Sequence, residues 1–173
     1  MKLLRFIPVL LLSCAVPDKI ETYNIAVVEK YIKAVEKKDF NTLDSLTHER
    51  FYIVGPSLGD TLVKRVWLEE WKLNTKNIIE KVDFTGSTIS QLNIPSRTEM
   101  GDWIGEWSVV NVQYKNLAEP VKLFANSNFL VVDGKVAKVL VFYNAADVTN
   151  QLGYIYSKQV TEELDSLNSI KMD

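Results

Sequence analysis

The chain has 173 residues, of which 47% are hydrophobic, 10% aromatic and 24% charged, and its net charge is −2. This length and composition predict one folded domain and exclude a disordered chain. The slightly acidic balance argues against nucleic acid as a partner, because nucleic acid favours a basic surface. One Cys and one His exclude an internal disulfide and a Cys/His zinc site, so we expect no metal and no cofactor.

The N-terminal residues 1–13 have the layout of a secretory signal peptide. A basic start precedes an apolar run over 6–12, which is shorter than the roughly 20 residues that span a bilayer. The run ends in Leu-Leu-Ser before Cys14, and this arrangement resembles the lipobox of bacterial lipoproteins. The resemblance implies lipid attachment at Cys14 and a protein anchored in the bacterial cell envelope, facing the periplasm or the cell surface. The alternatives are plain secretion, or a buried N-terminal helix with an incidental Cys.

Helical periodicity begins after a short tether over 14–22. Residues 23–38 carry apolar side chains at spacings of three and four, with charged residues on the other face, and this pattern predicts an amphipathic helix. The sequence Asp-Phe-Asn from Asp39 breaks the pattern, and we expect a second short helix around 43–46.

A short strand and a long helix are expected next. The β-rich segment 51–54 ends at a Gly-Pro pair, which is typical of a strand followed by a turn. Asp60 is a preferred N-cap residue, so we expect a helix over 61–81. Its expected inward stripe comprises Val63, Val66, Trp67, Trp71 and Ile78.

The remaining segments have strand periodicity. The alternation of apolar and polar residues predicts strands over 82–94, 102–115, 120–132 and 135–144. Asp133 and Gly134 predict a tight hairpin, because both residues tolerate positive φ. One or two helical turns are expected over 145–152, and the tail over 154–173 is either mobile or a docked helix. Helices followed by antiparallel strands define an α+β domain.

Several of these segments, in this order, resemble the nuclear transport factor 2-like (NTF2-like) superfamily, which includes the SnoaL-like polyketide cyclases and ketosteroid isomerase. The resemblance covers about residues 23–153 and rests on 31–40, 51–56, 132–136 and 142–147. It implies a cystatin-like, cone-shaped roll in which N-terminal helices pack inside a strongly curved antiparallel sheet. The hollow of such a cone often holds an apolar small molecule. Its outer sheet face often pairs two subunits, so we expect a homodimer.

The same resemblance identifies one of three catalytic groups. Isomerase chemistry needs a Tyr, a carboxylate base and a protonated acid. Tyr31 matches the family Tyr by its place in the first helix, but Gly55 stands at the position of the base and Ser127 at that of the acid. Isomerase activity is therefore not expected. The alternative reading of Tyr31 is a buried residue whose hydroxyl meets a backbone partner, and His48 is interpreted as a solvated turn residue.

The tryptophans are candidates for the lining of the hollow. Trp67 and Trp71 share a helix face, and Trp103 and Trp107 share a strand face. As a set they predict either an apolar ligand pocket or a simple core. Asn144 stands where many relatives carry an acid, and it offers hydrogen bonds to a ligand but no useful proton acceptor.

These observations predict a membrane-anchored, SnoaL-like binding module for a small apolar ligand, without a complete known active site. One alternative is a lyase, isomerase or cyclase acting on an apolar carbonyl compound, with Tyr31 and an unrecognised base such as Asp60 or Asp83. Another is a dimeric interaction protein whose hollow is filled. By comparison with the isomerase, Asn126 and Asn128 are expected to face outward. The expected ligand-binding residues are Tyr31, Ile53, Trp67, Trp71, Ser127, Phe129, Tyr143 and Asn144.

Overall fold

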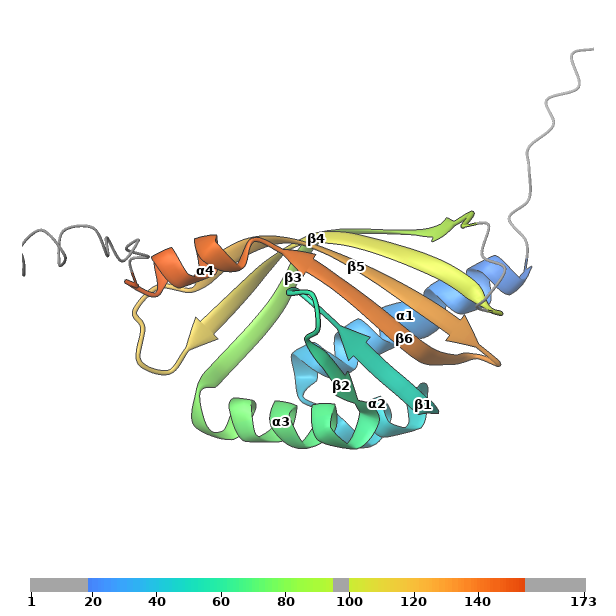
Figure 1. Ribbon diagram of the computed structural model, residues 1–173, viewed down its shortest axis with the longest axis horizontal. Helices are drawn as coiled ribbons and strands as arrows, with labels where there is room; N and C mark the ends of the chain where they lie inside the picture. Colours follow the sequence, from blue (N-terminus) through green and yellow to red (C-terminus); the bar gives the residue numbers. More distant parts are fainter. Residues whose placement is uncertain (1–18, 95–99, 155–173) are drawn as a thin grey trace, which may run out of the picture.

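The computed structural model describes residues 19–94 and 100–154. Its helices are α1 (Lys19–Lys37), α2 (Phe40–Leu46), α3 (Lys64–Asn77) and α4 (Ala145–Gln151). Its strands are β1 (Thr47–Val54), β2 (Thr61–Val63), β3 (Ile79–Leu92), β4 (Asp102–Tyr114), β5 (Val121–Val132) and β6 (Lys135–Tyr143). The strands form one curved sheet that arches over α1, α2 and α3, while α4 lies at one end of the sheet (Figure 1). The predicted α+β class and curved sheet are confirmed.

The sheet has the strand order β2-β1-β6-β5-β4-β3. All neighbouring strands run antiparallel except β1 and β6, which are parallel, so the sheet is mixed. The expectation of a purely antiparallel sheet is wrong at this one pairing. Parallel neighbours need a long crossover connection. Here the chain between β1 and β6 supplies it, because it contains β2, α3 and the strands β3, β4 and β5.

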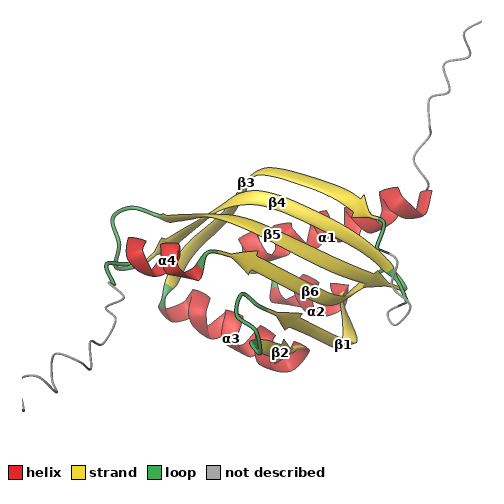
Figure 2. Ribbon diagram, turned by 45° about the horizontal axis from the view of Figure 1, so that its top comes forward, coloured by secondary structure: helices red, strands yellow, loops and turns green. Residues whose placement is uncertain are grey.

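Helix α1 lies across the concave face of the sheet (Figure 2). It begins at Lys19, within the segment predicted as a tether, and it buries Val28, Tyr31 and Ile32. The Glu36 carboxylate accepts a hydrogen bond from the backbone N–H of Phe84 at 2.8 Å, which fixes the C-terminal part of the helix on β3. The predicted signal peptide, Cys14, most of the predicted tether and the tail beyond Tyr154 lie outside the described residues.

Helices α1 and α2 meet at a sharp turn. Lys38 ends α1 with a φ of 56°, and Asp39 is the N-cap of α2. The Asp39 carboxylate accepts hydrogen bonds from the hydroxyl and backbone N–H of Thr42, at 2.7 and 3.0 Å. These two bonds favour the charged form and lower the pKa of Asp39. The predicted break at Asp39 and the short second helix are confirmed.

The prediction that Asp60 caps a helix over 61–81 is wrong. Residues 61–63 instead pair with β1 as β2, and helix α3 begins at Lys64 without a side-chain cap. The Asp60 carbonyl accepts a hydrogen bond from the Gly55 backbone N–H at 2.9 Å, which closes the β1–β2 hairpin. Cross-strand pairing therefore outcompetes the local capping preference. As a consequence the predicted inward residues Val63 and Ile78 are 56% and 49% exposed.

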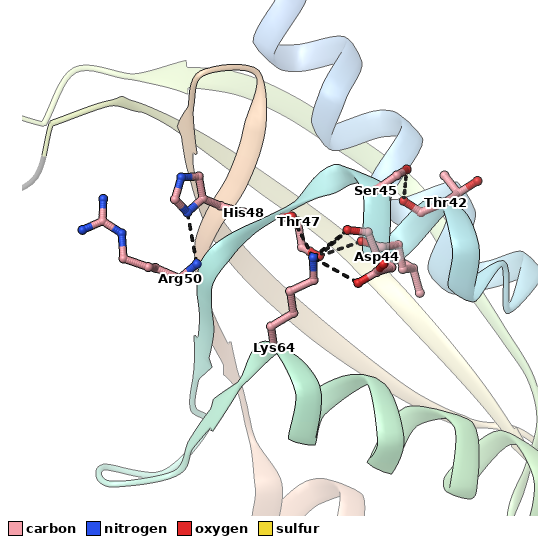
Figure 3. A network of polar contacts seen from close by, with 8 residues as sticks. Thr42, Asp44, Ser45, Thr47, His48, Arg50 and Lys64 are labelled. Atoms are coloured by element: carbon pink, nitrogen blue, oxygen red, sulfur yellow. Dashed lines mark hydrogen bonds and ion pairs between the residues drawn. The ribbon is translucent and has the colours of Figure 1, made fainter.

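Lys64 joins α3 to the end of α2 and the start of β1 (Figure 3). Its ammonium lies 3.0 Å from the Asp44 carboxylate, and it donates to the backbone carbonyl oxygens of Asp44 and Thr47 at 2.8 and 3.1 Å. These carbonyls lie at the C-terminal end of α2, where helices leave acceptors unsatisfied. The single side chain of Lys64 thus connects α3 to α2 and β1. In the same network His48 accepts a hydrogen bond from the Arg50 backbone N–H at 3.1 Å and belongs to β1, not to a turn.

The four long strands agree with prediction to within about three residues at each end. Asp133 and Gly134 form the predicted hairpin turn with φ values of 50° and 72°. Because paired residues of adjacent strands share a face, the register divides the sheet into a concave and an outer face. Ile104 and Phe129 pair on the concave face, under α1. In the described ranges, no helix is both long and apolar enough to cross a membrane.

Candidate functional site

A cavity of about 260 Å³ lies between the helices and the concave face of the sheet. Its walls are almost entirely apolar and come from α1, α3, α4 and all strands except β2. The structure brings together seven of the eight predicted ligand-binding residues in these walls: Tyr31, Ile53, Trp67, Trp71, Ser127, Phe129 and Tyr143. The cavity is therefore a defined space, and the tryptophans of α3 line it without filling it.

An aromatic cluster holds Tyr31 in place. The Tyr31 ring stacks on Trp67 with centroids 5.7 Å apart, and it meets Phe129 edge-on at 5.5 Å. Phe51, which is 1% exposed, packs against Trp67 at 5.2 Å. Aromatic pairs in these geometries are favourable beyond their buried area. The cluster consequently fixes the direction in which the Tyr31 hydroxyl points.

The Tyr31 hydroxyl is an unusual polar group in this apolar wall. Burial raises the pKa of the phenol, because the anion loses its hydration. Within residues 19–94 and 100–154 the hydroxyl makes no hydrogen bond. The alternative reading of Tyr31, a hydroxyl held by a backbone partner, is therefore wrong. The group stays neutral at physiological pH and can both donate to and accept from a bound molecule.

A second polar group of the wall also lacks a protein partner. The indole N–H of Trp71 is buried and has no hydrogen-bond acceptor within the described part of the chain. Buried donors in native proteins are almost always paired. Tyr31 and Trp71 both line the cavity, so an acceptor atom on a bound molecule would meet two uncommitted donors.

None of the described acidic or basic residues lines the cavity. Asp83 is paired with Asn111 on the outer face and lies 2.6 Å from the Lys81 ammonium, so it cannot act in the hollow. Asp60 lies in an adjacent hollow of about 480 Å³, which shares Ile53 and Trp67 with the cavity. Neither candidate base thus faces the interior.

Tyr114 and Tyr143 also line the cavity, and both are half-buried. Burial raises the pKa of both phenols, and for Tyr143 the nearby Asp60 carboxylate raises it further. A carboxylate near a phenol disfavours the phenolate, because two negative charges repel each other. Both hydroxyls therefore stay neutral.

Two other predicted pocket residues lie on the outer face. Trp103 and Trp107 pair with Leu130 and Asn126 on the face that points away from the helices, so the alternative in which all four tryptophans line one apolar pocket is wrong. Trp107 lies over Gly105, where a Cβ would approach the indole ring to 2.6 Å. The even spacing of Trp103 and Trp107 does place both side chains on one face of β4, but which face of the sheet is buried depends on the strand register.

Asn144 does not line the cavity. Its side-chain oxygen accepts hydrogen bonds from the backbone N–H groups of Ala146 and Asp147 at 3.1 and 3.2 Å, which makes it the N-cap of α4. The structure therefore assigns Asn144 a local structural role. Its position before a short helical segment was the available signal, because Asn is a preferred N-cap residue. As expected, Asn126 and Asn128 lie on the outer face, next to Ser127 on the concave face.

Glu106 was missed by the sequence reasoning. It is fully buried, and it pairs with Ile89 and Ser127 on the concave face of β4. The signal was present in the alternation: if Trp103 and Trp107 face outward, Glu106 faces inward. Within the described ranges, no three His, Cys, Asp or Glu side chains are grouped as metal ligands.

The fold is shared with several solved structures of low sequence identity. A candidate polyketide cyclase from Xanthomonas campestris pv. campestris superposes with a TM-score of 0.62 at 14% identity, over 76% of this chain and 98% of that one. An NTF2-like protein from Burkholderia xenovorans LB400 has a TM-score of 0.58 at 10% identity, over 75% and 95%. An LEH-like epoxide hydrolase from M. tuberculosis has a TM-score of 0.57 at 15% identity, over 77% and 91%.

At the level of sequence, no family model and no curated protein matches the chain. The architecture is nevertheless shared: the chain has the α+β fold of solved structures described as a polyketide cyclase, a ketosteroid isomerase-like fold and an NTF2-like protein. Identities of this order show the fold alone, and one fold of this kind carries several chemistries. Function must therefore be argued from the cavity.

Proposed function

We propose that the cone binds a small, neutral and mostly apolar molecule that carries a hydrogen-bond acceptor such as a carbonyl oxygen. The observation that carries this proposal is the apolar cavity of about 260 Å³, whose wall contains the Tyr31 hydroxyl and the Trp71 indole N–H; among the described residues neither group has a hydrogen-bond partner. Apolar walls with a few convergent polar groups are typical of ligand sites. A charged ligand is disfavoured, because no described ionisable acid or base of the wall would neutralise it.

The alternative of a lyase, isomerase or cyclase requires a proton acceptor within reach of the substrate. Tyr31 could polarise a carbonyl, but the candidate bases Asp60 and Asp83 lie outside the cavity wall. The absence of a carboxylate from the described wall supports binding over catalysis. The alternative of a filled hollow is disfavoured by the cavity itself.

The binding test uses two shape-matched probes, 2-acetylnaphthalene and 2-isopropylnaphthalene, titrated by isothermal calorimetry. The carbonyl probe is expected to bind more tightly than the hydrocarbon probe. Tyr31→Phe is expected to reduce the ratio of the two affinities about five- to tenfold, which corresponds to about one neutral hydrogen bond. Binding of neither probe would contradict the proposal.

The location of binding is tested by filling the cavity. Ala125 lines it from β5, so Ala125→Leu adds volume inside it and is expected to weaken both probes at least tenfold. Ala118→Leu, in the exposed β4–β5 turn, is the matched control and should leave both affinities unchanged. Unchanged affinity in Ala125→Leu would place the probes elsewhere.

We further propose that the domain is lipid-anchored in the bacterial cell envelope through Cys14. The support is the lipobox-like sequence before Cys14, since a doubly or triply acylated N-terminus binds membranes stably where one chain does not. Expression of Cys14→Ala in a bacterial host should release the protein from the membrane fraction. Retention of the variant there would contradict the anchor.

The proposed homodimer uses the outer sheet face. Three neighbouring aromatic residues of this face, Trp107, Phe124 and Phe142, are 43%, 84% and 53% exposed. Contiguous exposed apolar surface of this kind marks interaction sites. Light scattering should give twice the monomer mass, and Phe124→Glu should give the monomer; a wild-type monomer at micromolar concentration would contradict the proposal.

A further inference from the structure

Glu106 is a carboxylic acid enclosed in the cone, next to a residue of the cavity wall but not itself part of that wall. It is 0% exposed and lies on the concave face of β4, between Ile89 of β3 and Ser127 of β5. Acidic residues are almost never fully buried unless they are paired. Such a group is costly to keep in an apolar core, so its presence calls for a specific partner.

The protein satisfies only part of the hydrogen-bonding capacity of this acid. The Ser87 hydroxyl donates to Glu106 Oε1 at 2.6 Å. The second oxygen, Oε2, is buried without a partner in the described part of the chain, and so is the hydroxyl of Ser108. Ser108 stands two residues further along β4, on the same face. Two neighbouring polar side chains thus offer unused hydrogen-bonding atoms.

This polar pair adjoins the ligand cavity. Ser127 pairs directly with Glu106 across the β4–β5 ladder, and side chains in such pairs have Cβ atoms about 5 Å apart. Ser127 lines the cavity and is 6% exposed, so the cavity wall reaches the direct cross-strand neighbour of Glu106. Ala125, the partner of Ser108 across the same ladder, also lines the cavity.

We propose that Glu106, Ser108 and Ser127 form a hydrogen-bonding subsite that opens from the cavity at Ser127, the member of the three that lines it, and that takes an O–H donor of an otherwise apolar ligand. The carboxyl oxygen Oε2 accepts the donor's hydrogen, and the serine hydroxyls exchange hydrogen bonds with the same ligand group. The subsite rests on the proposed binding function and makes it more specific. The ligand class becomes a neutral, apolar alcohol or phenol that also carries an acceptor for Tyr31.

A purely structural role for Glu106 is disfavoured by the exposure of its one partner. Ser87 lies in the exposed bulge of β3 opposite Ser108, where water can replace the carboxyl oxygen. The hydrogen bond from Ser87 therefore does not require a buried acid. A buried acid kept only for stability would also use both of its oxygens, because an unpaired buried acceptor destabilises the fold.

The test compares 2-naphthol with 2-methylnaphthalene, which differ by a hydroxyl in place of a methyl group, in calorimetric titrations of the full chain. The wild type is expected to prefer 2-naphthol, and Glu106→Leu is expected to lose about five- to tenfold of this preference while still binding 2-methylnaphthalene. Glu106→Gln keeps an acceptor oxygen and should retain part of the preference. Glu119→Gln, an exposed turn residue, is the matched control and should retain all of it.

The outcomes separate the subsite from the proposed function. Equal affinity of the wild type for both probes, or a preference that persists in Glu106→Leu, would overturn the subsite while leaving the binding function intact. Failure of the wild type to bind either probe would overturn both. Ser108→Ala removes the second unpaired hydroxyl with little change in volume, and its loss of preference would support the subsite even if Glu106→Leu fails to fold. The urea midpoint of a folded Glu106→Leu is expected at or above that of the wild type, and a large decrease would assign Glu106 a structural role instead.

Discussion

Gly55 stands where the resemblance to ketosteroid isomerase implies a carboxylate base, and its backbone conformation leaves no room for one. The residue ends β1 with a φ of 109°, a conformation that side-chain-bearing residues rarely adopt. A Cβ built on it would collide with the backbone carbonyl oxygen of Val141 in β6 and lie 3.2 Å from the Val141 carbonyl carbon. Any replacement, including the Asp that would restore a base, must therefore displace the β1–β6 pairing.

The size of the effect follows from two separable costs. A positive φ costs a residue with a Cβ about 1–2 kcal/mol, and forcing extra atoms into a packed site costs about 1–3 kcal/mol more. Gly59 provides the comparison, because its φ is 97° but no atom lies within 4 Å of its virtual Cβ. We therefore expect Gly55→Ala to lower the free energy of unfolding by about 2–5 kcal/mol and Gly59→Ala by only about 1–2 kcal/mol.

Urea unfolding followed by tryptophan fluorescence measures both variants under identical conditions. The difference of about 1–3 kcal/mol isolates the collision with Val141 from the cost of the backbone conformation. A domain of ordinary stability, about 5–15 kcal/mol, tolerates both changes, so both values are measurable. Equal losses for the two alanine variants would refute the reasoning. A catalytically competent Gly55→Asp variant of unchanged stability would refute it more strongly.

Three further predictions concern stability. Phe51→Ala should lower the free energy of unfolding by about 3–5 kcal/mol, because Phe51 is 1% exposed and packs on Tyr31 and Trp67, and a loss below about 1 kcal/mol in urea unfolding would argue against that packing. Since burial raises the pKa of Tyr31, the unfolded phenol ionises near pH 10 while the folded one stays neutral, so stability should fall by about 1.4 kcal/mol per pH unit above about pH 10. Tyr31→Phe should flatten this slope in pH-dependent unfolding, and an unchanged slope would count against the buried phenol. Lys64→Met should lower the free energy of unfolding by about 1–2 kcal/mol, because it removes the ammonium that donates to the carbonyls of Asp44 and Thr47. Asp44→Asn removes the ion pair alone and should lower it by less than about 1 kcal/mol. Equal losses in urea unfolding would show that the exposed ion pair matters as much as the carbonyl contacts.

Local patterns in the sequence were sufficient for most of the secondary structure. The amphipathic stripe of α1, the alternation in β3 to β6 and the Asp133-Gly134 turn each follow from interactions between residues close in the chain. These local preferences are seen in the structure because local and tertiary interactions favour the same conformation in a natural sequence. The resemblance to NTF2-like proteins rested on their order, and the structural neighbours confirm that fold.

Features that depend on distant partners could not be predicted in this way. Residues 61–63 form β2 because β1 offers a free edge, and this pairing overrides the capping preference of Asp60. The parallel pairing of β1 with β6 depends on how the whole chain returns, which leaves no local trace. Asn144 illustrates the reverse error, because a residue read as a ligand contact satisfies the backbone of its own helix.

The candidate site shows the same division. The sequence by itself determined that β4 and β5 are strands with alternating sides, and that Tyr31 lies in the first helix beside its apolar stripe. Only the tertiary structure decided that Trp103 and Trp107 face outward while Glu106 faces inward, because a strand has two faces and a shift of one residue exchanges them. The burial of one face against α1 and α3 makes that choice, and no interaction within a single strand contains it.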